Sequence, residues 1–269
     1  MRSALLRGRD CDRLGTIETI AEGPAAIALS RGGAPKVYDY VDPNEDACLF
    51  AIGEGGVLVA LADGHNGEYG ARRLIEGIEA ELAPAACAAR PPSLDAAGWC
   101  DFLYAGVRAA ASGIDEYRAA HQLALAPTTL SLAVVRQREG CWAWCCVGDS
   151  HAFRVDAAAA HDLGLRADES RRGYFLGKPP ESWHRDATSL GFEPLGDIRA
   201  VVLASDGLSE NGIGLDDPAA AVFEAVTAAR EIEPGRRNQW LARELAERAN
   251  ASHRKRRSGD NISTAVVHP

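Results

Sequence analysis

Short apolar runs alternate along the chain with turns rich in Gly and with segments of helical periodicity. The apolar runs predict strands at residues 47–52, 56–62, 128–135, 141–147, 151–155, 198–205 and 261–267. Helical periodicity predicts helices at about residues 67–82, 99–117, 216–230 and 236–251. Pro84 is expected to end the first helix.

The order of these elements is strands, two helices, strands, two helices and a strand. Short turns at Gly53–Gly56, Arg136–Gly140 and Gly148–Ser150 predict hairpins, so the strands they join should be antiparallel. The strand runs are nearly continuously apolar, as in strands that are covered on both faces. This pattern predicts an α+β protein with two packed sheets and helices outside.

Residues 161–195 lack periodicity and are rich in Gly, Pro and charge. They are predicted to form a long irregular loop, and such loops in compact domains are usually functional or mobile.

Composition limits the possible partners and compartments. The 269 residues are 46% hydrophobic and 25% charged, enough for one large domain or two small ones. The net charge of −9 argues against nucleic acid or an anionic membrane as the main partner. The start, "MRSALLRGRD", lacks the apolar stretch of a signal peptide, and no run reaches the length of a membrane span. A cytoplasmic protein is expected, and the preference for Arg over Lys is associated with high-GC bacterial genomes.

The seven cysteines are odd in number and irregularly spaced along the chain. They do not form a disulfide framework or a CxxC zinc pair, so they are expected to be small apolar residues in a reducing compartment.

Acidic residues recur where apolar runs begin or end. The segments "LADGHNG", "VGDSHA", "LASDGLSENG" and "GDNISTAVV" place a Gly beside Asp63, Asp149, Asp206 and Asp260. A single Asp-Gly pair is usually a turn, but four at strand edges predict carboxylates that converge. The "PNEDA" segment can add Glu45 and Asp46, although this pair alone could equally be a solvated loop. An all-oxygen cluster suits Mg²⁺ or Mn²⁺.

In this order the segments resemble the motifs of the metal-dependent (type 2C, PPM) serine/threonine protein phosphatases. The resemblance spans about residues 44–267 and implies one phosphatase domain over residues 1–269. It implies a four-layer α/β/β/α sandwich of two antiparallel sheets flanked by helix pairs, with a binuclear metal site in the cleft. Residues 161–195 would then be a reduced form of the family's flap.

Site roles follow from the same resemblance. Asp63 would bridge two Mn²⁺ or Mg²⁺ ions, with the carbonyl of Gly64 as a further ligand. Asp206 and Asp260 would hold one metal, and Glu45, with Asp46 beside it, would serve the other. Asp149 would hold a weak third metal with Asp206. His65 would protonate the leaving alkoxide, or would only be a polar neighbour of the site.

Two positions depart from the family's motifs. Val41 stands where the family usually has a phosphate-binding Arg, and His151 replaces the common Arg of "GDSR". Lys36 and Arg31 are candidates for the missing phosphate contact. The basic run "HRKRRSG" at residues 253–259 is either a cationic helix end or a rim that attracts phosphate.

The predicted function is hydrolysis of phosphoserine and phosphothreonine in proteins by a metal-activated water, opposing a Ser/Thr kinase. One alternative is an inactive or weak pseudophosphatase that serves as a regulatory binding module, as the loss of Arg at Val41 would permit. Another is a phosphatase for small phosphoesters.

Overall fold

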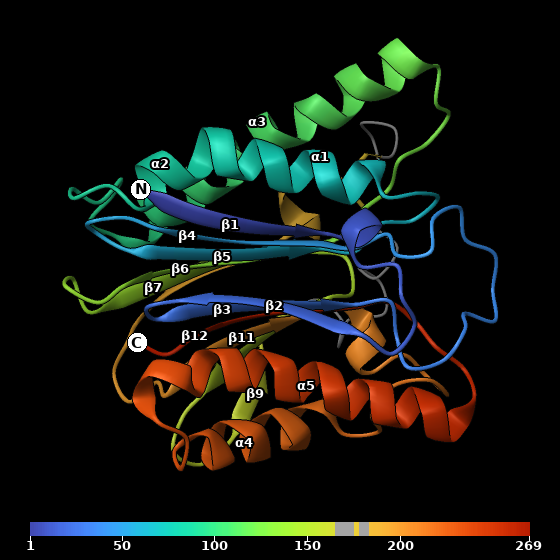
Figure 1. Ribbon diagram of the computed structural model, residues 1–269. Helices are drawn as coiled ribbons and strands as arrows, with labels where there is room; N and C mark the ends of the chain where they lie inside the picture. Colours follow the sequence, from blue (N-terminus) through green and yellow to red (C-terminus); the bar gives the residue numbers. More distant parts are fainter. Residues whose placement is uncertain (165–174, 178–182) are drawn as a thin grey trace.

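A computed structural model of the chain describes residues 1–164, 175–177 and 183–269. Two six-stranded sheets lie face to face with helices on both outer sides (Figure 1). The first sheet has the order β1-β4-β5-β6-β7-β10. Its strands are Arg2–Arg7 (β1), Ala47–Ile52 (β4), Val57–Ala62 (β5), Leu130–Arg136 (β6), Cys141–Val147 (β7) and Ser189–Pro194 (β10).

The second sheet has the order β2-β3-β12-β11-β8-β9. All strand pairs in both sheets are antiparallel. Its strands are Ile17–Glu22 (β2), Ala25–Ser30 (β3), Ile262–Val267 (β12), Ala200–Ala204 (β11), His151–Val155 (β8) and Ala160–Asp162 (β9).

Helices cover the outer face of each sheet (Figure 1). On the first sheet lie α1 (Tyr69–Gly77), a π-helical turn (Ile78–Leu82), α2 (Ala83–Ala86) and α3 (Ala96–His121). On the second lie α4 (Pro218–Ala229) and α5 (Pro234–Arg256). Asp95 and Asp217 cap α3 and α4 by accepting hydrogen bonds from Gly98 and Ala220. Short 3₁₀ turns occur at Gly8–Asp10, Arg185–Ala187 and Asp206–Leu208.

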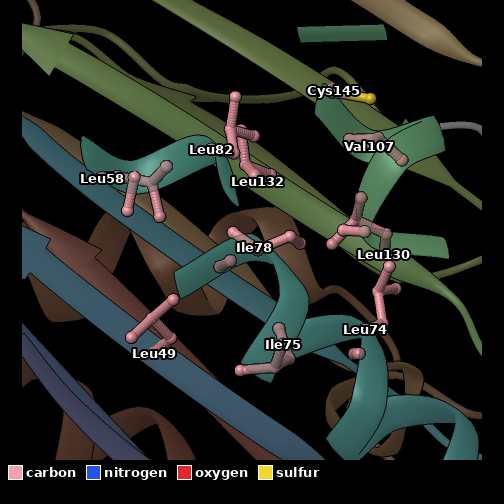
Figure 2. Close-up of a cluster of buried hydrophobic side chains, with 14 of the residues drawn as sticks. Leu49, Leu58, Leu74, Ile75, Ile78, Leu82, Val107, Leu130, Leu132 and Cys145 are labelled. Atoms are coloured by element: carbon pink, nitrogen blue, oxygen red, sulfur yellow. The ribbon is translucent and has the colours of Figure 1, made fainter. Parts of the chain in front are cut away.

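Three apolar layers hold the sandwich together. One lies between the first sheet and its helices, where Leu74, Ile78 and Leu82 pack on strand residues such as Leu49 and Leu132 (Figure 2). A second lies between the two sheets, and a third lies between the second sheet and α4 and α5. Strands buried on both faces explain why their sequences are almost continuously apolar.

The four-layer α+β architecture is therefore confirmed, with local differences. Strands β1, β2, β3, β9 and β10 have no counterpart among the predicted strands. The predicted hairpin at Gly148–Ser150 is wrong, because β7 and β8 belong to different sheets and this turn crosses between them. Pro84 does not end the helical segment, since it sits in the first turn of α2, where its missing N–H is tolerated.

The stretch from residue 161 to 195 is more regular than expected where it is described. It contains the end of β9, a 3₁₀ turn and β10, which pairs along its whole length with β7. The expectation of an irregular, flap-like loop otherwise falls on residues 165–174 and 178–182, which lie outside the described part of the chain. No helix among the described residues is long and apolar enough to cross a membrane.

Strand register brings several chain turns to one rim of the sandwich. In the first sheet, Ala62 at the end of β5 is opposite Ala47 at the start of β4, and Leu130 at the start of β6 is opposite Val147. In the second sheet, Ala204 at the end of β11 lies between Thr264 of β12 and His151 of β8. The acidic segments follow or precede these strand ends, so both sheets deliver them to the same rim.

Candidate metal-dependent phosphatase site

Asp63 lies at the centre of this rim, directly after β5. Its carbonyl accepts hydrogen bonds from the Thr128 hydroxyl (2.8 Å) and the Thr129 amide (2.9 Å), and its own amide donates to Thr129 Oγ1 at 3.1 Å. Burial raises the pKa of the Asp63 carboxyl well above its usual range, and nearby Asp46, Asp206 and Asp260 raise it further. A hydrogen bond with Asp206 adds to the effect, so the two carboxyl groups share a proton when no cation neutralises them.

Glu45 and Asp46 precede β4 on the same rim. Oε1 of Glu45 accepts hydrogen bonds from the amides of Val41, Asp42 and Gly67, at 2.8–3.1 Å, and so ties two loops together. Burial raises the pKa of Asp46 to about 6, although Lys36 opposes the shift. Neither oxygen of Asp46 has a hydrogen bond of good geometry among the described residues, although Ser263 and Ser205 lie near enough to lower its pKa. A bound cation would stabilise the charged form of this buried carboxyl group.

Gly64 and Gly207 stand where backbones approach each other too closely for a side chain. A Cβ on Gly64 would lie 2.5 Å from the carbonyl oxygen of Glu45, and one on Gly207 would lie 1.9 Å from that of Asn261. The Gly that follows each Asp therefore lets the loops of the rim pack directly against each other.

The loop that carries Asp206 is fixed by a buried histidine of α5. The amides of Ser209 and Glu210 donate to the Asp206 carbonyl at 2.7 and 2.6 Å. His253 accepts a bond from the Gly33 amide at Nδ1 (3.3 Å), which leaves Nε2–H to donate to the Gly207 carbonyl at 2.9 Å. Burial lowers the pKa of His253, in keeping with a neutral ring.

Asn261 joins three segments behind Asp260. Its Nδ2 donates to the carbonyls of Arg31 (3.2 Å) and Pro43 (3.1 Å), and its Oδ1 accepts from the amide of Glu45 at 2.9 Å. The side chain is buried, so each of these bonds holds the acidic loops in register. Asn261 directly follows Asp260 in the "GDN" sequence, but the sequence pattern predicts a role only for Asp260.

A lysine enters the acidic cluster directly. Lys36 Nζ lies 3.4 Å from Asp260 Oδ1, with only 6% of the lysine side chain exposed. Burial lowers the pKa of Lys36, but Asp260, Asp63, Asp46 and Glu45 outweigh it, so the net pKa is raised and the ammonium stays charged. The Tyr38 hydroxyl also faces the site: burial, and then the charge of Asp260, raise its pKa.

His65 lies beside the acids and is partly buried, with its Nε2 atom shielded from solvent. Its amide donates to the Pro127 carbonyl at 2.8 Å, and its ring packs edge-on against Phe175 with centroids 4.8 Å apart. Nε2 has no hydrogen-bond partner among the described residues. Burial lowers the pKa of His65, and the negative charges of Asp149, Asp260 and Glu45 oppose that shift.

Asp149 and His151 occupy the crossing from β7 to β8. His151 is buried, and its Nδ1 donates to Asp162 Oδ2 at 2.6 Å. Burial would raise the pKa of Asp162, but this hydrogen bond and the charge of His151 lower it, so Asp162 accepts as a carboxylate. Nε2 of the same ring forms a hydrogen bond with the Ser209 hydroxyl at 2.6 Å. His151 thus connects β9 to the loop that carries Asp206.

The other predicted cations lie elsewhere. Arg31 Nη1 donates to the carbonyl of Asp12 at 2.9 Å. The basic run belongs mostly to the last turn of α5, where Arg254 pairs with Glu247 and Arg256 with Asp216. This arrangement favours the cationic helix end.

The donor set fits hard divalent cations. Carboxylates from both sheets meet at one rim, Asp46 and Asp63 have pKa values raised mainly by burial, and no Cys belongs to the group. Within residues 1–164, 175–177 and 183–269, no three His, Cys, Asp or Glu side chains are already spaced as a metal-ligand set. The ions would be held by the carbonyl of Gly64 and by five acids, Glu45, Asp46, Asp63, Asp206 and Asp260. The charge of Asp149 acts on His65, which lies beside these acids.

Comparison of the sequence with protein-family profiles identifies one family. The profile of the family described as protein phosphatase 2C matches residues 39–246. A search of curated protein sequences finds no significant match.

Solved structures share the fold at low sequence identity. They include the PPM Ser-Thr phosphatase MsPP from Mycobacterium smegmatis in complex with cacodylate (22% identity, TM-score 0.60), covering 91% of this chain and 97% of that one. The serine/threonine phosphatase PstP/Ppp of Mycobacterium tuberculosis has 19% identity and a TM-score of 0.61, with coverage of 94% and 98%. Stp1 of Staphylococcus aureus has 15% identity and a TM-score of 0.60, with coverage of 95% and 96%. With the family profile spanning most of its length and its fold shared with these enzymes, the chain belongs to the protein phosphatase 2C family.

Proposed function

We propose that this protein hydrolyses phosphoserine and phosphothreonine in protein substrates, at a site that binds two Mn²⁺ or Mg²⁺ ions. The observation that supports it best is the convergence of Asp46, Asp63, Asp206 and Asp260 from two sheets on one rim. When bound, the ions supply Lewis acidity that activates water and offsets phosphate charge. The loops around Asn261 and Thr129 keep the carboxylates in place for this role.

The direct test is phosphate release from phosphoserine and phosphothreonine peptides with Mn²⁺. A phosphotyrosine peptide and a small sugar phosphate are the comparison substrates. We expect faster turnover of the serine and threonine peptides. A clear preference for the sugar phosphate would instead support a small-phosphoester phosphatase.

His65 is proposed to protonate the leaving alkoxide. We expect His65→Ala to slow hydrolysis of a phosphothreonine peptide by about a hundredfold, because a threonine alkoxide is a poor leaving group and general-acid help is worth at least that much. Hydrolysis of p-nitrophenyl phosphate should change little, since nitrophenolate leaves without a proton. His161→Ala is the control, because His161 is exposed and pairs with Arg154 of β8, three residues from the end of β8 that faces the site. Equal losses on both substrates would contradict the role.

Weak binding of the substrate phosphate is expected, because Val41 stands where the family usually has a phosphate-binding Arg. Its side chain is 66% exposed, while its amide is bound to Glu45 beside the acids. We expect Val41→Arg to lower the KM for p-nitrophenyl phosphate by about tenfold or more, because a charge-assisted hydrogen bond contributes about 1.5–3 kcal/mol. The kcat should change little, since such an Arg would hold ground and transition states alike.

Val37→Arg is a matched control, because Val37 is 70% exposed on the same segment. If Val41→Arg leaves KM unchanged while Lys36→Ala raises it at saturating Mn²⁺, Lys36 already makes the phosphate contact. Absence of turnover with every metal and variant would favour the pseudophosphatase, which the loss of Arg at position 41 makes the second candidate.

A further inference from the structure

The acidic rim contains its own cation. Lys36 Nζ is 3.4 Å from Asp260 Oδ1, and 6% of the lysine side chain and 10% of the Asp260 side chain are exposed. The sequence has only three lysines, the others being Lys178 and Lys255. Burial of such a charge is tolerated only beside opposite charges.

The backbone around Lys36 directs the side chain inward. Lys36 and Gly259 form a parallel bridge, and the Gly259 amide donates to the carbonyl of Pro35 at 2.9 Å. A Cβ on Gly259 would lie 1.7 Å from the carbonyl oxygen of Ala34, so the two segments touch backbone to backbone. Lys36 is thus held directly beside Asp260.

Aromatic rings complete the lysine's surroundings. Nζ lies 5.3 Å from the ring centre of Tyr38 and 5.6 Å from that of Tyr40, and both distances are within the range of cation–π attraction. Asp260 is its closest carboxylate, and Asp63, Asp46 and Glu45 also act on its charge. These are the same carboxylates that would hold divalent ions, so the ammonium and a metal need the same negative charge.

We propose that Lys36 is a built-in competitor of the metal: its ammonium neutralises Asp260 in the metal-free protein and has to leave that carboxylate before an ion binds there. This inference rests on the metal-site assignment within the proposed function. The lysine then weakens metal affinity and supports the metal-free fold. Once displaced, the same ammonium lies at the rim, where a phosphate would arrive.

Metal affinity gives the first test. Purified full-length protein, stripped of metal, is titrated with MnCl₂ by calorimetry alongside Lys36→Met and Lys255→Met; Lys255 is exposed near the end of α5. We expect Lys36→Met to bind Mn²⁺ at least about tenfold more tightly, because a positive charge next to a ligand is removed. Lys255→Met should bind Mn²⁺ like the original protein.

Metal-free Lys36→Met should also melt at a lower temperature than the metal-free original protein. Unchanged or weaker Mn²⁺ binding by Lys36→Met overturns the proposal. If Lys36→Met does not fold, Lys36→Gln is used in its place with the same expected results.

The unaltered protein gives a second test. Brief labelling with an amine-reactive acetylating reagent, followed by peptide mass spectrometry, compares Lys36 with Lys255 before and after addition of Mn²⁺. We expect Lys36 to be protected without metal and to be labelled severalfold faster with saturating Mn²⁺, while Lys255 is labelled equally in both. Continued protection of Lys36 at saturating Mn²⁺ overturns the proposal.

Neither readout depends on catalysis, so the two proposals can fail separately. Tighter Mn²⁺ binding by Lys36→Met without turnover of any phosphopeptide supports the lysine's role and overturns the proposed function. Metal-dependent turnover of phosphopeptides, together with an unchanged Mn²⁺ affinity in Lys36→Met, supports the proposed function and overturns the lysine's role. Absence of Mn²⁺ binding in every protein overturns both.

Discussion

Asp63→Asn is expected to lower phosphopeptide turnover by about a thousandfold or more at saturating Mn²⁺. Asp63 is the carboxylate that touches Asp206 and is influenced by Asp46 and Asp260, so it is central among the residues that would hold the ions. Metal ions stabilise the charge of such transition states by several kcal/mol, and each 1.36 kcal/mol corresponds to a tenfold change in rate. Steady-state kinetics at several Mn²⁺ concentrations measure the loss.

The same substitution should stabilise the metal-free protein. The folded-state pKa of Asp63 is raised above its unfolded value, chiefly by burial, so the folded chain binds more protons. Stability therefore falls as pH rises above about 4, the usual pKa of Asp, and it stays reduced at neutral pH. Asn carries no charge and can donate a hydrogen bond to Asp206. Urea unfolding in EDTA should thus show Asp63→Asn to be the more stable protein at pH 7.

Asp197→Asn is the control for both measurements, because Asp197 is exposed in the turn before β11, at the rim opposite the site. It should change neither turnover nor stability appreciably. Asp206→Asn should repeat the loss of activity. Near-normal turnover in Asp63→Asn or Asp206→Asn at saturating Mn²⁺ would contradict the assignment of these residues as ligands.

Removal of divalent ions is expected to abolish hydrolysis completely. Excess EDTA should reduce p-nitrophenyl phosphate hydrolysis to background, because the proposed nucleophile is a water activated by the ions and the carboxylates without ions repel a phosphate. Added Mn²⁺ or Mg²⁺ beyond the chelator should restore it. The melting temperature should rise with the metal concentration, since ligands that bind only the folded state stabilise it. Full activity in EDTA would rule out the proposed site.

Much of the architecture could be predicted because the central strands are apolar on both faces. The predicted strands are all present, and the helices differ mainly at their ends. Strands β1 and β2 were missed because they lie at sheet edges with part of their residues exposed, which weakens the apolar signal. The turn at Gly148–Ser150 looked like a hairpin because turn length alone does not reveal a change of sheet.

The acids of the site were predictable because each follows or precedes an apolar run and adjoins a Gly. Residues that support them were harder to recognise, since their partners are distant in sequence. Asn261 is bonded to Glu45 across 216 positions, and His253 reaches Gly207 across 46. The contact between Lys36 and Asp260 likewise depends on how residues 34–36 lie against Gly259. Pairing of this kind is set by the tertiary fold.

The division of the acidic site between two sheets has a consequence for folding kinetics. Asp63 belongs to the first sheet and Asp206 to the second, so they meet only after the apolar faces between the sheets have docked. Burying the two carboxyl groups side by side then opposes the last step of assembly, and a divalent cation can offset this cost only when that step is complete. Divalent ions should therefore slow unfolding far more than they accelerate folding, as interactions absent from the transition state do. A bound metal would connect the two sheets only at the end of folding and would lengthen the lifetime of the folded protein.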